Sequence, residues 1–222
     1  MVRHTFLSLA LAGGCIYCLA AVRQAHSEQA ADAGFKPVAP TSLLTEIQKE
    51  QLERIKKAGD SPRMKEVVEV GEIVAELFNL KQYAKDANAE ASAQGRKLAQ
   101  ELVAAAKAKK ADDVKRIVNE VAPLIEKSAT GEGGKDLPAY KPVATVHSLM
   151  EVQQDHFDAL KKAINAGDKF EEIEKHALVL AELSNVNAHQ KDADDYRNWA
   201  RTAREQSLKI AGAAKDNNKD LA

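Results

Sequence analysis

The histidines are the residues of this chain best suited to hold a metal ion or a haem, because a neutral imidazole nitrogen is a common ligand. The chain has 222 residues and six histidines. Four of them lie in its second half, at His147, His156, His176 and His189, whereas residues 35–129 contain none. A metal or haem site, if present, is therefore expected in the second half of the chain.

His156 is the histidine whose position suggests the most specific chemistry. In a helical projection of about 100° per residue it lies about 20° from Leu149, near the centre of a stripe of apolar residues. There it could serve as an axial ligand inside a helical bundle, or it could be a half-buried histidine that hydrogen-bonds to a neighbour, which is the simpler interpretation. His147 and Met150, near the start of the same predicted helix, are further candidate axial ligands, although a polar residue at a helix start also explains His147.

Two aromatic residues, Tyr196 and Trp199, lie three positions apart on one face of another predicted helix. They could stack on a flat cofactor, or they could fill a helical core, which is favoured in a chain with 5% aromatic residues. The histidines and carboxylates do not show the spacings of metal sites, and the phosphate-binding, dinucleotide-binding and nucleophile motifs are missing. The sequence therefore predicts neither a metal site nor an enzyme.

The composition predicts long helices. It is 45% hydrophobic and 29% charged with 6 prolines and 11 glycines, which is a globular profile depleted in strand and turn formers. The 32 basic and 33 acidic residues leave a net charge of −1, which excludes a broad electrostatic attraction to nucleic acid or to an anionic membrane. We therefore expect no nucleic-acid partner.

The beginning of the sequence has the pattern of an export signal. A short basic start precedes the apolar run 6–21, after which the chain becomes polar. We predict a cleaved signal peptide at 1–25 and a flexible lead-in at 26–34, and hence an exported, periplasmic protein; an uncleaved N-terminal membrane anchor is the alternative. No second apolar stretch is long enough to span a membrane. Cys15 and Cys18 lie in the predicted signal, and their C-x-x-C is not followed by the histidine of a covalent haem site.

After the lead-in, the chain consists of two similar copies. Phe35-Lys-Pro-Val-Ala39 matches Tyr140-Lys-Pro-Val-Ala144 at an offset of 105 positions, and the match continues with one inserted residue. We predict one domain at 35–129 (copy 1), a glycine-rich linker at 130–139 and a second domain at 140–222 (copy 2).

Within each copy the apolar residues have the spacing of amphipathic helices. In copy 2 the stripe of the first helix consists of Leu149, Val152, Phe157 and Leu160. Ser148 and Glu151 have the spacing of a capping box, which predicts the start of that helix. Further helices are predicted at 64–80, 87–109, 112–127, 170–186 and 193–215.

These patterns predict an all-α fold of tandem antiparallel helical bundles. Copy 1 has the segments of a four-helix up-down bundle, whereas copy 2 has three helices and lacks the fourth. Three amphipathic helices leave an open apolar groove, and such a patch is normally a contact site. Either the sequence is shortened relative to its relatives, or the groove is filled by copy 1, a second chain or a partner protein.

Three strings in copy 2 carry a family resemblance. They read Lys141-Pro-Val-Ala-x-x-His147-x-Leu-Met-Glu151, Leu180-Ala-Glu-Leu-x-Asn-x-Asn187 and Asp195-Tyr-x-x-Trp199-Ala-x-x-Ala-Arg204. Together with the helical patterning of both copies, they are similar to the exported four-helix bundles of the cytochrome c-prime and cytochrome b562-like family. The resemblance implies a haem inside the bundle and electron transfer or gas binding in the periplasm, with a redox partner that the sequence does not identify.

The chain departs from that family at the fourth helix. The resemblance implies a C-x-x-C-H motif there in c-type members, but residues 118–126 contain neither cysteine nor histidine, and copy 2 stops before the corresponding stretch. A b-type site would pair His147, Met150 or His156 with a histidine on the fourth helix, and no residue fills that second role. One hypothesis is an exported bundle related to haem-binding electron carriers, with the haem site absent from copy 1 and incomplete in copy 2. The other is a haem-free structural or protein-interaction module that binds a partner, or itself, through the open groove of copy 2.

Overall fold

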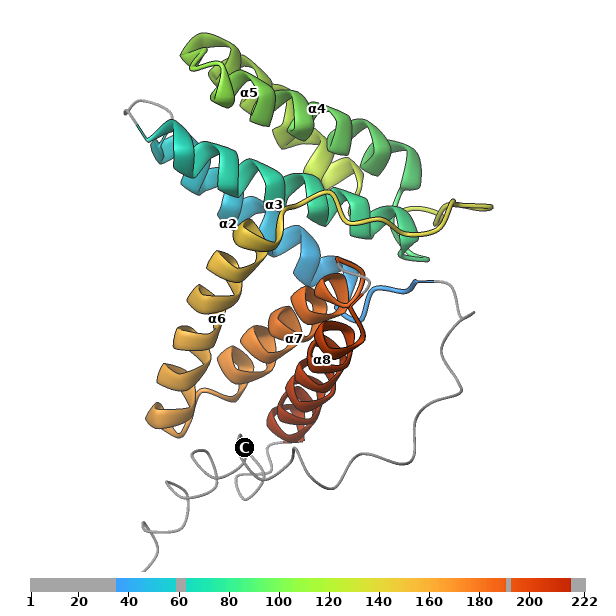
Figure 1. The fold of residues 1–222 in the computed structure, drawn as a ribbon, viewed down its shortest axis with the longest axis vertical. Coiled ribbons are helices and arrows are strands. Elements are labelled where there is room, and N and C mark those ends of the chain that lie inside the picture. Colours follow the sequence, from blue (N-terminus) through green and yellow to red (C-terminus); the bar gives the residue numbers. More distant parts are fainter. Residues whose placement is uncertain (1–34, 59–62, 191–192, 217–222) are drawn as a thin grey trace, which may run out of the picture. The chain divides into compact units, whose positions relative to one another are not determined.

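The computed structural model describes residues 35–58, 63–190 and 193–216, and within these ranges it contains seven α-helices and no strand (Figure 1). The helices are α2 (Thr41–Ala58), α3 (Met64–Tyr83), α4 (Ala89–Lys107), α5 (Ala111–Lys127), α6 (Val146–Ala166), α7 (Phe170–Asn187) and α8 (Asp194–Lys215). The predicted all-α class is therefore confirmed for the described residues. The predicted signal peptide and lead-in at 1–34, with Cys15 and Cys18, lie outside them.

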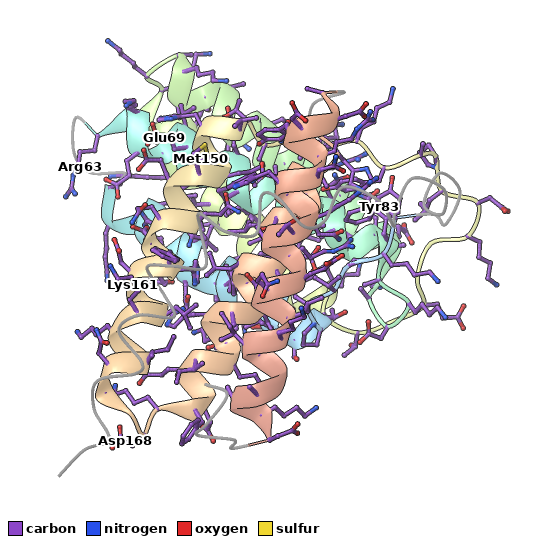
Figure 2. All side chains as sticks on the ribbon, turned by 60° about the horizontal axis from the view of Figure 1, so that its bottom comes forward. Arg63, Glu69, Tyr83, Met150, Lys161 and Asp168 are labelled. Atoms are coloured by element: carbon purple, nitrogen blue, oxygen red, sulfur yellow. The ribbon has the colours of Figure 1, made fainter. Side chains whose placement is uncertain are left out.

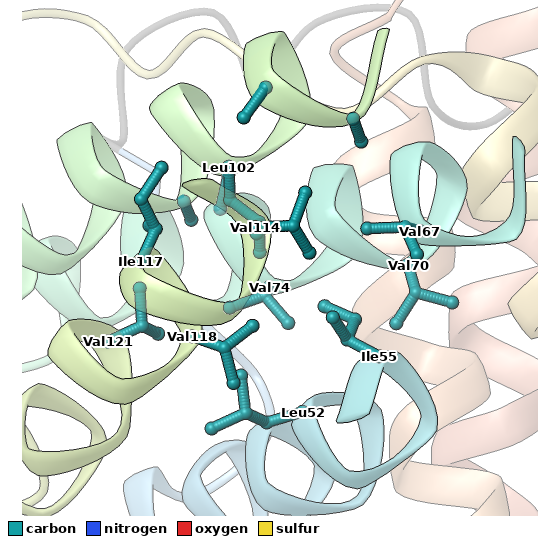
Figure 3. Packing of buried hydrophobic residues seen from close by; sticks show 14 of the residues in the cluster. Leu52, Ile55, Val67, Val70, Val74, Leu102, Val114, Ile117, Val118 and Val121 are labelled. Carbon is teal, nitrogen blue, oxygen red and sulfur yellow. The ribbon is translucent and has the colours of Figure 1, made fainter. Parts of the chain in front are cut away.

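The four helices of copy 1 share one hydrophobic cluster. α3 packs against α2 and α4, and α5 packs against α4 and α2. The cluster consists of apolar residues that recur at helical spacing on all four helices, among them Leu52, Ile55, Val70, Val74, Leu102, Val114, Val118 and Val121 (Figure 3). Phe78 of α3 belongs to the same cluster. α5 thus covers the faces of α2 and α4 that would otherwise be exposed.

The three helices of copy 2 share a thinner cluster. Its buried members include Leu160, Ile173 and Leu180, whereas the buried members from α8 are the alanines Ala211 and Ala214, with the half-buried Ile210 packed against them. Because alanine side chains bury little apolar area, α8 is held by less hydrophobic contact than α4 is in copy 1. No helix in the described part of the chain is long and apolar enough to cross a membrane.

A further hydrophobic cluster joins the two copies. It contains Leu44 and Ile73 of copy 1 together with Leu149, Val152 and other residues of copy 2. A small apolar cavity of about 10 Å³, no larger than a water molecule, lies in this cluster and is lined by residues of both copies, among them Leu44, Ile73 and Val152. The sequence leaves open whether the copies pack together, and in the structure they share a buried interface.

The linker between the copies lies against the turn that joins α3 to α4. The backbone N–H of Gly131 donates to Asp86 O at 3.0 Å, and that of Gly133 donates to Lys85 O at 2.9 Å. A Cβ at Gly133 would lie 2.6 Å from Ala84 O, so a larger residue does not fit without a shift of the backbone. The glycines of this segment therefore permit close backbone contact in addition to forming a turn.

Candidate functional site

The three candidate axial ligands do not point toward a common space. His156 is buried, and its Nδ1 lies 2.9 Å from Nδ1 of His176 on α7. His147 is exposed, with Nε2 at 3.2 Å from Glu69 Oε1 of α3. Met150 is also on the surface of α6, with 54% of its side chain exposed (Figure 2).

The two buried-facing histidines form a hydrogen-bonded pair of neutral rings. Burial, together with smaller contributions from the positive charges of His176, Lys175 and Arg54, lowers the pKa of His156 to about 4. Burial also lowers the pKa of His176. At neutral pH one ring therefore donates a hydrogen bond through its Nδ1–H, and the Nδ1 of the other ring accepts it. This is the simpler of the two interpretations of His156, and it explains why a histidine is accommodated in the apolar stripe.

The aromatic pair of α8 lies at the surface. The ring centroids of Tyr196 and Trp199 are 6.0 Å apart, and the Tyr196 hydroxyl donates to Asn187 Oδ1 at 3.2 Å. Trp199 is 53% exposed, so the expectation that it fills the core is wrong. The cause is that the neighbouring buried positions of α8 are alanines, which let the helix approach α7 closely and leave Trp199 outside.

These positions do not fit a haem. A haem iron in a bundle needs ligands that converge from facing helices, together with a space for the porphyrin. Here His156 is the one buried candidate, and its Nδ1 is hydrogen-bonded to His176. His147 and Met150 are exposed. The ligands implied by the family resemblance are therefore not brought together among the described residues.

What the structure does bring together is a set of exposed apolar side chains in copy 2. The large hydrophobic residues that are most exposed in the described chain are Met150 at 54%, Phe157 at 48% and Trp199 at 53%. On α6, Met150, Phe157 and Ile164 fall within about 40° of one another at 100° per residue, beside the buried stripe. The Lys161 ammonium lies 5.7 Å from the centroid of the Phe157 ring, so its cationic end also lies on this face.

Copy 1 shows what covers this face. Phe157 corresponds to Leu52 at the offset of 105, and Leu52 is 3% exposed because Val118 and Val121 of α5 lie in the same cluster (Figure 3). Met150 corresponds in the same way to Thr45, which is 6% exposed. The two exposed positions of α6, Met150 and Phe157, are thus buried at their equivalents in copy 1.

The same comparison holds for α8. Arg96 donates to Asn79 Oδ1 at 3.0 Å, and Arg204 donates to Asn185 Oδ1 at 3.1 Å, which aligns α4 with α8 at an offset of 108 positions. Trp199 then corresponds to Ala91, which is 1% exposed. Ile210, which is half-buried, corresponds to Leu102, which is fully buried by the helices of copy 1.

We call the open face of copy 2 the exposed side chains of Met150 and Phe157 on α6 and Trp199 on α8, together with Ile164 and Ile210, which are half-buried and also pack against the cluster of copy 2. Periodicity alone places Phe157 in the buried stripe, and that prediction is wrong because it counts only the angle of the residue and not the helix that would cover it. The signal that could have identified Phe157 is its alignment with Leu52, a position that needs a fourth helix to be buried. Comparisons of this chain with protein-family models, curated proteins and solved structures found no match.

Proposed function

We propose that the protein is a haem-free interaction module whose open face binds an amphipathic helix of a partner protein. In this proposal copy 1 is a complete four-helix up-down bundle, and copy 2 is the same bundle with the place of the fourth helix left for the partner. The observation that carries the proposal is the contrast between Leu52, 3% exposed beneath α5, and Phe157, 48% exposed at the equivalent position. The pattern of the first 25 residues supports export, so we expect the partner outside the cytoplasm.

The chemistry of the occupant follows from α5. This helix is 17 residues long and buries one stripe of aliphatic residues, Val114, Ile117, Val118, Val121, Leu124 and Ile125. A helix with the same spacing would lie between α6 and α8 as α5 lies between α2 and α4. The α5 helix of a second molecule is already buried against its own copy 1, and its release would expose this stripe. A helix of a different protein is therefore the favoured occupant.

Charge adds a preference to the apolar contact. In copy 1, Lys49 of α2 and Glu126 of α5 form an ion pair at 2.6 Å across the helix interface. On the open face the cation is Lys161, which lies over the Phe157 ring. We therefore expect the partner helix to carry a carboxylate at the edge of its apolar stripe, near Lys161.

The exposed area sets the strength of binding. Covering the exposed half of one large apolar side chain contributes roughly 1 kcal/mol, and the open face offers three such side chains. A partner helix brings several apolar residues of its own, but ordering it costs part of the gain. The sum is compatible with a dissociation constant in roughly the micromolar range, which suits reversible association.

The experiment uses the full chain and a fluorescently labelled synthetic peptide with the sequence of Ala111–Lys127. We expect saturable binding in fluorescence anisotropy, weakened at least tenfold by Phe157→Asp and unchanged by Asn165→Asp, which adds the same charge at another exposed position of α6. Absence of binding, or equal binding to both variants, would overturn the proposal. A concentration-dependent dimer in sedimentation velocity that Phe157→Asp abolishes would also overturn it, because a second molecule of this protein would then occupy the open face.

The family resemblance implies haem, and this hypothesis has a test of its own. Because the candidate ligands do not converge, we expect the full chain to develop no Soret band when micromolar haem is added. A Soret band that is lost in His156→Ala or His147→Ala would favour the haem hypothesis instead.

A further inference from the structure

Each copy inserts its leading segment into the other copy. The backbone N–H groups of Val38 and Ala39 donate to Glu182 Oε2 of α7, at 2.6 and 2.7 Å. At the equivalent positions, the N–H groups of Val143 and Ala144 donate to Glu76 Oε2 of α3, at 2.6 and 2.9 Å. One carboxylate oxygen thus accepts two consecutive backbone donors in both places.

An asparagine three residues after each glutamate completes the contact. Asn185 Nδ2 donates to Lys36 O at 3.1 Å and to Glu182 Oε1 at 3.2 Å. Asn79 Nδ2 donates in the same way to Lys141 O at 3.0 Å and to Glu76 Oε1 at 2.9 Å. Each amide also accepts a hydrogen bond through its Oδ1 atom: Asn185 accepts from Arg204, and Asn79 accepts from Arg96.

The recognised peptide is defined by its backbone. In both segments the lysine carbonyl accepts a hydrogen bond from the asparagine, and the valine and alanine N–H groups donate to the glutamate. The intervening proline, Pro37 or Pro142, has no N–H to leave unpaired and restricts the chain to an extended course. Each site therefore binds an extended segment through the backbone atoms of its Lys-Pro-Val-Ala stretch. The Glu76 site also accepts from the Tyr140 hydroxyl, which Phe35 lacks at the equivalent position.

The aromatic contacts of the two segments show the same reciprocity. The rings of Phe35 and Tyr140, which occupy equivalent positions, are stacked with centroids 3.6 Å apart and planes at 9°. Tyr83 and His189, which are also equivalent, approach this stack edge-on from the two copies, with centroids 5.2 to 5.6 Å away. This is the self-complementary pattern of a two-fold symmetric interface.

We propose that the Glu-x-x-Asn pair of each copy is a binding site for the Lys-Pro-Val-Ala segment of the other copy. The chain is then a two-fold dimer of repeats whose two halves are joined by the linker. The two copies then remain bound without the linker. This inference does not depend on the open face, which lies on other residues of α6 and α8.

The cost of an empty site explains why the segments stay bound. Glu182 and Glu76 are each 1% exposed with the segments in place, so each loses two backbone N–H donors if its segment leaves and depends on water to replace them. A buried carboxylate with unmade hydrogen bonds is strongly unfavourable. The shared hydrophobic cluster of Leu44, Ile73, Leu149 and Val179 adds non-directional contact, whereas the segments determine the pairing of the copies.

The experiment is to cut the linker in the full chain. A protease site replaces residues 135–138, and the cleaved protein is diluted stepwise and analysed by size exclusion at pH 8, because burial raises the pKa of Glu182 to about 7. We expect the two fragments to elute together with unchanged helical circular dichroism. Separate elution of folded fragments, or loss of helicity on cleavage, would overturn the proposal.

Matched variants test the segments themselves. Val38→Pro with Val143→Pro removes one donor from each site, and we expect the cleaved fragments to separate at a concentration at least tenfold higher than in the parent. Lys36→Ala with Lys141→Ala is the control, and it leaves elution unchanged because the sites read only the backbone there. If the proline variant fails to fold before cleavage, Glu182→Gln alone, which leaves the Glu76 site intact, takes its place. Equal separation of parent and variant would show that the hydrophobic cluster alone joins the copies, and would overturn the assignment of the binding sites.

Discussion

At the scale of single residues, the pair of His156 and His176 shows how a titratable group is accommodated in an apolar stripe. The two rings satisfy each other through their Nδ1 atoms, and the facing charges from other elements are those of Arg54 on α2 and Lys175 on α7. Glu46 and Glu50 of α2 pair with Lys175 and thereby reduce its influence. Protonation of both histidines would break their hydrogen bond and leave a charge in the apolar interior.

The pair makes stability depend on pH. The pKa of His156 is lowered from 6.5 to about 4 in the folded protein, so the unfolded chain binds more protons between these values and stability is lost as pH falls through this window. We expect a loss of about 2 kcal/mol between pH 7 and pH 5 from this histidine, since one pKa unit corresponds to about 1.4 kcal/mol. Urea unfolding at both pH values measures it.

The control for this prediction comes from copy 1. Replacing His156→Gln and His176→Val installs the residues that copy 1 carries at Gln51 and Val70, both of which are buried. The variant should lose this part of the pH dependence. Parallel stability profiles of parent and variant would contradict the account.

The sequence identifies His156 as a buried polar residue but not its partner. His176 lies at the edge of the stripe of its own helix, and whether it meets His156 depends on the rotation of α7 against α6. The same holds for Glu76 and Glu182, whose bonds reach segments far away in the chain. Periodicity defines which side of a helix is buried, and it contains no information on what lies opposite.

At the scale of helices, small residues determine how closely neighbours approach. A Cβ at Gly95 of α4 would lie 2.4 to 2.6 Å from atoms of the fully buried Phe78 ring of α3. At the equivalent positions copy 2 has Ala203 and Ser184, so a smaller residue on α7 accompanies a larger one on α8. In copy 1 the larger residue is on α3 and the smaller on α4. In copy 2 the residue on α7 is smaller than its equivalent, and the residue on α8 is larger.

This contact predicts opposite effects of one substitution at two glycines. Gly95→Ala should destabilise by roughly 1–3 kcal/mol, because overpacking against Phe78 outweighs the better helix propensity of alanine. Gly212→Ala, on α8 with nothing within 4 Å of the added Cβ, should stabilise by about 0.5–1 kcal/mol. Thermal unfolding followed by circular dichroism measures both, and a stabilising Gly95→Ala would refute the close contact.

The open face predicts a second contrast between helices. Leu52→Asp buries a charge beneath α5 and should cost roughly 3–5 kcal/mol, enough to unfold much of copy 1. Phe157→Asp, at the equivalent position of α6, should change the free energy of unfolding by less than about 1 kcal/mol because the side chain is 48% exposed and the added charge can reach water. Chemical denaturation of the two variants distinguishes them. Equal losses would mean that Phe157 is covered in solution.

The helices themselves are largely predictable from the sequence. The predicted 64–80, 112–127 and 170–186 correspond to α3, α5 and α7 within three residues at either end. The start of α6 differs, because Thr145 and not Ser148 is the N-cap: its side chain accepts the Ser148 N–H, and α6 begins at Val146. Ser148 instead donates its hydroxyl to Glu72 Oε2 of α3, a contact between copies that local capping patterns do not contain.

At the scale of the whole molecule, the repeat predicts that the copies are alike but not that they bind each other. Likeness can be recognised by comparing the two stretches of sequence, whereas contact requires knowing that Glu76 and Glu182 lie within reach of the opposite segments. The same comparison of copies defines the open face, since it shows which positions of copy 2 would be buried by a fourth helix. The proposed binding of a partner helix depends on this difference between two copies that otherwise match.

Trp199 allows this account to be tested directly, because it is the only tryptophan of the chain and lies on the open face. Titrating the full chain with the unlabelled Ala111–Lys127 peptide, which has no tryptophan, should shift the emission of Trp199 to shorter wavelength and saturate. The shift should be lost in Phe157→Asp and retained in Asn165→Asp. An emission maximum that does not move, or that moves equally in Phe157→Asp, would contradict the claim that the open face binds a helix.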